Sequence, residues 1–140
     1  MDERTLHLLE QFSRIINGDG DPSDLGCHGT VEELLARSHE IFPGVPVCVV
    51  SDWVWVDISM SEEMIARLRS ERNLEPTLLY SESVQFDKKG RFGHGSVVRT
   101  SLLTQFKAPC FFRTRNTLYV MQGTGVRLSV EPDVITSMVF

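Results

Sequence analysis

From residue 77 to residue 130 the chain alternates short apolar runs with residues typical of turns, and this pattern restricts the fold more than any other feature. Runs rich in β-branched and aromatic residues predict strands, and the stretches between them are rich in residues that favour turns. Consecutive strands joined by tight turns form antiparallel sheets. The pattern therefore predicts a β-meander, with strands at 77–86, 96–106, 110–114, 118–122 and 126–130.

The remainder of the chain is mostly helical in pattern. Apolar residues at helical spacing predict helices at 3–16, 31–42 and 62–72. Thr30 is placed to cap the second of these helices, and Ser59 or Ser61 the third.

Three further segments complete the predicted secondary structure. The apolar run at residues 45–58 predicts either one long central strand or two strands broken near Ser51 and Asp52, and we favour two segments of one sheet. The Gly- and Asp-rich residues 17–29 predict a loop, and Pro132 suits the first turn of a short final helix.

These elements predict an α+β fold over residues 1–140 as a single domain. We expect one antiparallel β-sheet, the C-terminal meander, with the three N-terminal-half helices packed on one face and a short C-terminal helix. A chain of 140 residues buries enough surface to fold without a metal or a disulfide.

The net charge of −5 conceals a marked asymmetry. Residues 1–76 contain six arginines and fifteen acidic residues, whereas residues 77–130 contain eight lysines and arginines against only Glu82 and Asp87. An excess of basic residues in one half can indicate an anionic partner. The alternative is that acidic helices and basic strands neutralise each other within one fold.

The cysteines and the N-terminus bear on location. Cys27, Cys48 and Cys110 are odd in number and widely spaced, which favours reduced thiols and a reducing compartment. Residues 1–16 lack the basic start and unbroken apolar run of a secretory signal, and no stretch is long enough to span a membrane. We therefore expect a cytoplasmic protein that has no membrane partner.

No complete catalytic or metal-binding set is visible. Asn17, Asp19 and Asp21 alternate as calcium ligands do, but Pro22 and His28 occupy positions where an EF-hand needs Gly and an acid. We expect no catalytic residue, no metal and no cofactor. The alternative left open is an enzyme in which Cys27 or Cys110 is activated by a histidine, such as His28 or His94, that the fold brings close.

The basic side chains of the second half are the candidate binding residues. Arg113 and Arg115 are two residues apart, so a strand places them on one face. We predict that at least three of four arginines share one exposed sheet face and form the main binding surface. The four are Arg99, Arg113, Arg115 and Arg127.

A glycine-rich loop carries the other candidates. Residues 90–96 read Gly-Arg-Phe-Gly-His-Gly-Ser after two lysines, and such a loop can hold a phosphate or an acidic partner. It does not open a helix, so it is neither a P-loop nor a dinucleotide fingerprint. The residues concerned are Lys88, Lys89, Arg91 and His94.

The most distinctive stretch of sequence is Cys110-Phe-Phe-Arg-Thr-Arg-Asn-Thr-Leu-Tyr-Val-Met-Gln-Gly-Thr-Gly-Val-Arg127, which follows Val98-Arg-Thr-Ser-Leu-Leu103. Over residues 97–130 the chain resembles a small family of uncharacterised bacterial proteins, some of them prophage-linked. The resemblance implies no activity and no functional residues.

Our leading hypothesis is a non-catalytic binding or regulatory module, whose basic sheet face contacts a protein or a nucleic acid. Two alternatives remain. One is a small cysteine- and histidine-dependent enzyme, and the other is an immunity or inhibitor protein whose acidic helical half covers a basic target. A homo-oligomer is also open.

Overall fold

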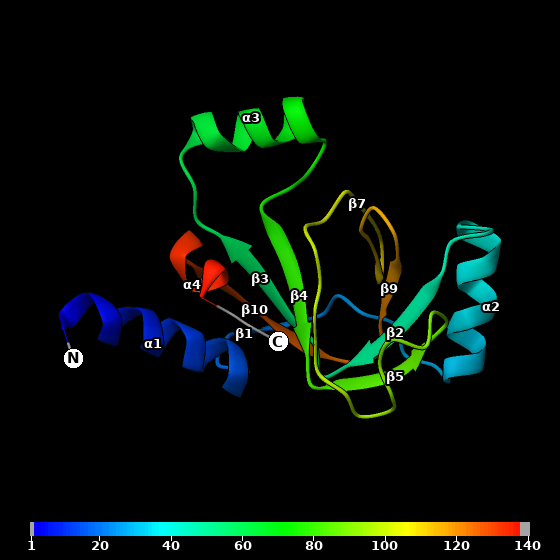
Figure 1. The fold of residues 1–140 in the computed structure, drawn as a ribbon. Helices are drawn as coiled ribbons and strands as arrows, with labels where there is room; N and C mark the ends of the chain where they lie inside the picture. The colour runs from blue at the N-terminus through cyan, green and yellow to red at the C-terminus, as the bar shows by residue number, and fades with distance from the viewer. Residues whose placement is uncertain (1, 138–140) are drawn as a thin grey trace.

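The computed structural model describes residues 2–137, which form four helices and two mixed five-stranded sheets, an α+β fold as predicted (Figure 1). The helices are α1 (Glu3–Asn17), α2 (Val31–Ile41), α3 (Glu62–Arg72) and α4 (Pro132–Thr136). Asp2, Thr30 and Ser61 cap the first three, because each side chain accepts a hydrogen bond from the backbone N–H three residues on.

The strands divide between the sheets in an order that differs from the sequence. The first sheet has the order β1-β10-β3-β4-β6 and the second β5-β2-β9-β8-β7. The first comprises β1 (Asp21–Ser23), β10 (Gly125–Val130), β3 (Val54–Ile58), β4 (Thr77–Ser81) and β6 (Val98–Arg99). The second comprises β5 (Ser83–Asp87), β2 (Val47–Ser51), β9 (Leu118–Met121), β8 (Phe111–Arg113) and β7 (Gln105–Lys107).

Three continuous stretches of chain run through both sheets. Strands β2 and β3 are separated only by Asp52 and Trp53, β4 and β5 only by Glu82, and β9 and β10 only by residues 122–124. In each sheet the middle stretch pairs with its neighbours in the same way: β3 lies antiparallel to β4 and parallel to β10, and β2 lies antiparallel to β5 and parallel to β9. The two sheets are therefore the two ends of three sharply bent strands.

Three strand predictions are wrong. Residues 77–86 are not one strand, because the chain bends at Glu82 and divides them between β4 and β5 in different sheets. Residues 45–58 are not two segments of one sheet, because Asp52 adopts a left-handed conformation (φ 46°) and turns the chain from one sheet into the other. Residues 96–106 are not one strand, since β6 ends at Arg99 and β7 begins at Gln105 in the other sheet. The predicted loop at 17–29 also contains β1, which pairs with β10.

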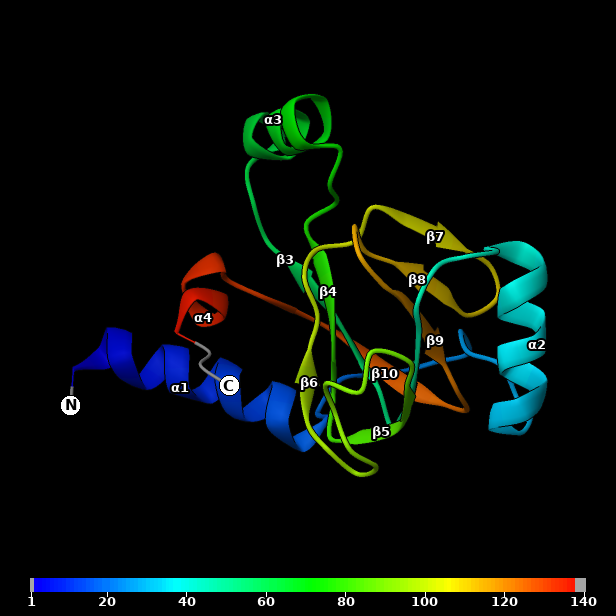
Figure 2. The ribbon, with the colours of Figure 1, turned by 45° about the vertical axis from the view of Figure 1, so that its right-hand side comes forward.

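The helices do not share one face as predicted. α1 and α4 pack on the outer face of the first sheet, where Ile15 and Val134 meet apolar side chains of β3, β4 and β10. α2 packs against the second sheet through Leu34. Figures 1 and 2 show α3 standing away from both sheets, and none of its residues is buried.

Several aromatic side chains pack between the sheets. Trp55 packs edge-on against Phe106 and Phe112 of the second sheet, with ring centroids 5.1 and 5.2 Å apart. Trp53 is fully buried and Trp55 is 5% exposed, so both tryptophans belong to the core. None of the described helices is long and apolar enough to cross a membrane.

Candidate anion-binding cleft

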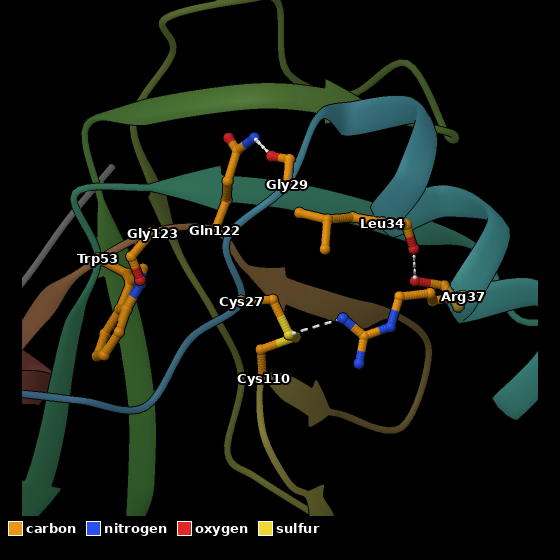
Figure 3. The surroundings of a disulfide bond; sticks show 9 residues. Cys27, Gly29, Leu34, Arg37, Trp53, Cys110, Gln122 and Gly123 are labelled. Atoms are coloured by element: carbon orange, nitrogen blue, oxygen red, sulfur yellow. Dashed lines mark hydrogen bonds between the residues drawn. A yellow bond between two sulfur atoms is a disulfide. The ribbon is translucent and has the colours of Figure 1, made fainter.

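Cys27 and Cys110 form a disulfide bond across 83 residues of sequence, with their Cα atoms 5.5 Å apart (Figure 3). The predicted set of reduced thiols is therefore wrong for these two residues. The error arose because the partner of Cys27 lies in the turn before β8, which only the folded chain brings alongside. The argument for a reducing compartment, which depended on unpaired cysteines, is lost with it.

The disulfide joins the segment that precedes α2 to the residue before β8, and hydrogen bonds join the same segment to the end of β9. The Cys27 N–H donates to the Met121 carbonyl at 2.9 Å, and the Gly123 N–H donates to the Cys27 carbonyl at 2.8 Å. The Gln122 amide donates to the Gly29 carbonyl, as Figure 3 shows. Because both sulfur atoms are bonded and buried, neither cysteine can act as the nucleophile of the enzyme alternative.

Cys48 is the one free cysteine among the described residues, and it is fully buried in β2. Burial, with a smaller effect of Asp87, raises the pKa of its thiol to about 12. We expect iodoacetamide at neutral pH to label Cys48 in the folded protein on the order of a thousandfold more slowly than in urea, because little thiolate is present. Mass spectrometry of labelled peptides measures this difference, and rapid labelling of the native chain would contradict it.

The glycine-rich loop binds its own carboxylate. The Asp87 side chain is fully enclosed, and it accepts hydrogen bonds from the backbone N–H groups of Arg91 and Phe92 as well as from the Arg91 guanidinium. Burial opposes ionisation of this carboxyl, but the hydrogen bonds from Arg91 outweigh it and lower the pKa of Asp87. The donors that would hold a phosphate there are already in use.

The other predicted residues of that loop lie apart from the arginines on the sheets. Lys88 and Lys89 are exposed at the tip of the turn that follows β5. His94 shares a hydrogen bond of 3.1 Å with the Gln85 side chain of the same hairpin. Within residues 2–137, no hydrogen bond or ion pair links these three side chains to one another.

The four arginines do not share a sheet face, so that prediction is wrong. Arg99 is aligned with Tyr80 and Arg127 with Trp55, and these two positions point to opposite faces of the first sheet. Arg113 belongs to the second sheet. Sequence alternation places side chains on one or the other side of a strand, but it does not reveal which sheet the strand joins.

Two of the four are engaged within the fold. The Arg127 guanidinium donates to both Asp57 oxygens, at 2.6 and 3.2 Å, and lies 5.2 Å from the Trp55 ring centroid. Arg113 lies 5.6 Å from the Phe42 ring centroid and donates to the Thr114 carbonyl. The other two, Arg99 and Arg115, line a cleft.

Arg99 and Arg115 meet at a cleft of about 270 Å³ beside the C-terminal end of α3. Arg99 comes from the edge strand β6 and Arg115 from the turn after β8, so the two sheets contribute one arginine each. No acidic residue lines the cleft, and the other lining residues are Leu74, Leu78, Thr100, Ser101 and Leu102.

The Arg99 guanidinium is unusual in its surroundings. Its Nε atom is buried and has no hydrogen-bond partner, the one such side-chain atom in the part of the chain that the structure describes. A half-buried arginine whose Nε atom has neither a carboxylate nor another hydrogen-bond partner carries the desolvation cost of that atom without compensation. An anion entering the cleft would remove that cost, so Arg99 marks the cleft as a candidate anion site.

Arg115 connects the same cleft to α3. Its Nη2 atom donates to the Arg72 carbonyl at 3.0 Å, at the end of the helix where a positive charge is favourable. A guanidinium has five N–H donors, so most of those of Arg115 stay available to a ligand. Glu75, the residue after Leu74 of the cleft, is held by three hydrogen bonds from Arg69.

Replacing Arg99 tests whether its charge is uncompensated. We expect Arg99→Met to raise the free energy of unfolding by about 1 kcal/mol, because it removes an unpaired buried donor and keeps the apolar stem. Arg113→Met is the matched control. It should be neutral or destabilising, because the variant loses the cation–π contact with Phe42 and the hydrogen bond to the Thr114 carbonyl. Urea unfolding measures both variants. A less stable Arg99→Met protein would mean that the guanidinium supports the fold.

A larger cleft of about 550 Å³ opens where the three strands bend, beside the end of α1. Asp52 and Glu82 line it, and the Tyr80 hydroxyl donates to Glu82 at 2.7 Å. Burial and this carboxylate raise the pKa of Tyr80. Within residues 2–137, no group of three or more His, Cys, Asp or Glu side chains is placed to hold a metal ion.

The model of the family described as a domain of unknown function, DUF6957, matches residues 24–137. The chain belongs to this family. The DUF6957 match includes both disulfide cysteines and both arginines of the cleft, whereas α1 and β1 precede it. Comparisons with curated proteins and with solved structures find no match.

Proposed function

We propose that this chain is a non-catalytic binding module, and that its Arg99–Arg115 cleft receives an acidic segment of a partner protein. The observation that carries the proposal is the buried, unpartnered Nε atom of Arg99 in a cleft that no carboxylate lines. Buried cationic groups are normally paired, so a missing partner in the free protein points to one supplied by a ligand.

A protein partner suits the surface better than a nucleic acid. Nucleic acids are held by many cations that contact successive phosphates, and single strands also stack on aromatic rings. Here Arg91 and Arg127 are paired with carboxylates, Trp53 and Trp55 are buried, and the net charge is −5. One cleft with two arginines matches a single acidic group.

The setting that we propose is the bacterial, prophage-linked one to which the sequence resemblance points. Because Cys27 and Cys110 are paired, we do not extend the proposal to a cytoplasmic location. The proposal also excludes the cysteine-dependent enzyme, since the two thiols that it requires form the disulfide.

Two anionic probes test this proposal: a ten-residue peptide of alternating alanine and glutamate, and the oligonucleotide dT10. We expect the peptide to bind at 150 mM salt, and Arg115→Glu to weaken binding at least tenfold, because a charge-assisted hydrogen bond contributes about 1.5–3 kcal/mol. Isothermal titration calorimetry measures both affinities. Arg14→Glu, which reverses an exposed charge on α1, is the control.

Either of two results would contradict the proposal. The first is tighter binding of dT10 than of the peptide, since this would indicate a nucleic-acid site. The second is an equal loss of peptide affinity in Arg115→Glu and Arg14→Glu. This would mean that the peptide responds to the overall charge of the protein and not to the cleft.

A further inference from the structure

Resting on the proposed function, we infer that the group accepted by the cleft is a carboxylate on an apolar stem, a glutamate side chain flanked by apolar residues, and not a phosphate. The inference follows from the donors that the cleft offers, from its apolar wall and from the charges around it.

The donors match a group with two oxygens. The Arg99 guanidinium makes no hydrogen bond within the described chain, and Arg115 uses one donor on the Arg72 carbonyl. Thr100 offers nothing further, because its hydroxyl donates to the Ser101 carbonyl and accepts from the Leu79 N–H. Two planar guanidinium forks pair well with the two oxygens of a carboxylate. Ser101, which also lines the cleft, contributes a further hydroxyl.

The wall of the cleft is apolar. Leu74, Leu78 and Leu102 contribute to it, and Leu78 is fully buried beneath. A volume of about 270 Å³ corresponds to roughly nine water-sized groups of about 30 Å³ each. The five non-hydrogen atoms of a phosphate would fill about half of this space and leave the leucines against water. A glutamate side chain together with part of an adjacent apolar residue fills it and covers the leucines.

The surrounding charge also favours a single negative charge on the ligand. The cleft lies at the C-terminal end of α3, where the helix dipole is negative, and the whole chain carries a net charge of −5. Both repel an anion in proportion to its charge. A phosphate monoester carries about −1.5 to −2 at neutral pH, so it meets up to twice the repulsion of a carboxylate.

Four blocked pentapeptides separate the possibilities, and their affinities are measured by nuclear magnetic resonance titration at pH 7 in 150 mM salt. The reference is acetyl-Ala-Leu-Glu-Leu-Ala-amide. In the others the glutamate is replaced by glutamine or by phosphoserine, or both leucines are replaced by serine. We expect affinity to fall at least tenfold with glutamine, at least threefold with phosphoserine and at least threefold with serine flanks.

Protein variants tie the binding to the cleft. Arg99→Gln and Arg115→Gln should each weaken binding of the reference peptide at least tenfold, whereas Arg14→Gln should leave it within twofold. Circular dichroism checks that the variants fold. Arg115 is exposed, so its variant remains informative if Arg99→Gln does not fold.

The outcomes distinguish the inference from the proposed function on which it rests. Tighter binding of the phosphoserine peptide, or no effect of the serine flanks, would contradict the inference that the ligand is a carboxylate on an apolar stem. The proposal of an acidic protein partner would remain. Equal binding of the glutamate and glutamine peptides, or binding that is indifferent to Arg99 and Arg115, would overturn both.

Discussion

Breaking the disulfide between Cys27 and Cys110 should lower the free energy of unfolding by about 4–5 kcal/mol. In the chain-entropy model, a cross-link stabilises a protein by restricting the unfolded chain, and the effect grows with the length of the closed loop. Here the two cysteines are 83 residues apart, so the restriction is large. Domains of this size are commonly stable by only about 5–15 kcal/mol, so the loss removes much of the total.

Urea unfolding of the Cys27→Ser/Cys110→Ser double variant measures this loss. Adding a thiol reductant to the parent protein should produce the same midpoint, and the double variant should not respond to the reductant. The matched control is Cys48→Ala with the disulfide intact, which separates the cross-link from cysteine packing. A double variant as stable as the parent would show that the cross-link does not restrict the unfolded chain.

Truncating Trp53 should cost about 3–5 kcal/mol, the range found for large aromatic side chains removed from cores. Trp53 is fully buried at the bend between β2 and β3. Its indole N–H donates to the Gly123 carbonyl at 3.3 Å, and its own carbonyl accepts from the Val126 N–H at 3.1 Å. The ring also occupies the space beside Gly125 that a Cβ atom would need. Trp53 thus joins two of the three bends.

Calorimetric or urea unfolding of Trp53→Ala tests this prediction. Trp53→Phe keeps a ring in the site and should lose clearly less stability than Trp53→Ala. Met64→Ala on α3 is the surface control, because Met64 is 53% exposed and its loss should change stability by no more than about 0.5 kcal/mol. A loss below about 1 kcal/mol in Trp53→Ala would mean that the bends hold without the indole.

Local sequence signals predicted local structure well. Thr30 was predicted to cap one helix, and Ser59 or Ser61 another, because a hydroxyl three residues ahead of a backbone N–H is a short-range relation. Thr30 and Ser61 are the caps in the structure. The turns between β8, β9 and β10 were also predicted from their local residues. The pairing of strands was not, because a parallel pair such as β2 with β9 joins residues about 70 apart in sequence.

The candidate site was predictable only in part. Arg99 and Arg115 were identified as exposed cations in a basic half of the chain, but they were grouped with Arg113 and Arg127. The carboxylate and aromatic partners of those two arginines come from distant segments, namely Asp57, Trp55 and Phe42. The leucines that wall the cleft carry no signal beyond apolarity, so nothing in the sequence marked them as part of a site.

The three bent strands bear on how this architecture can be inherited. Each one supplies a strand to both sheets, so a recombination event that transferred one sheet would have to cut all three in the middle of a hydrogen-bonded stretch. A gene fragment that encodes either half would leave exposed strand ends and half of a core. We therefore expect the strands from β2 to β10 to be gained, lost or fused to other proteins only as a whole.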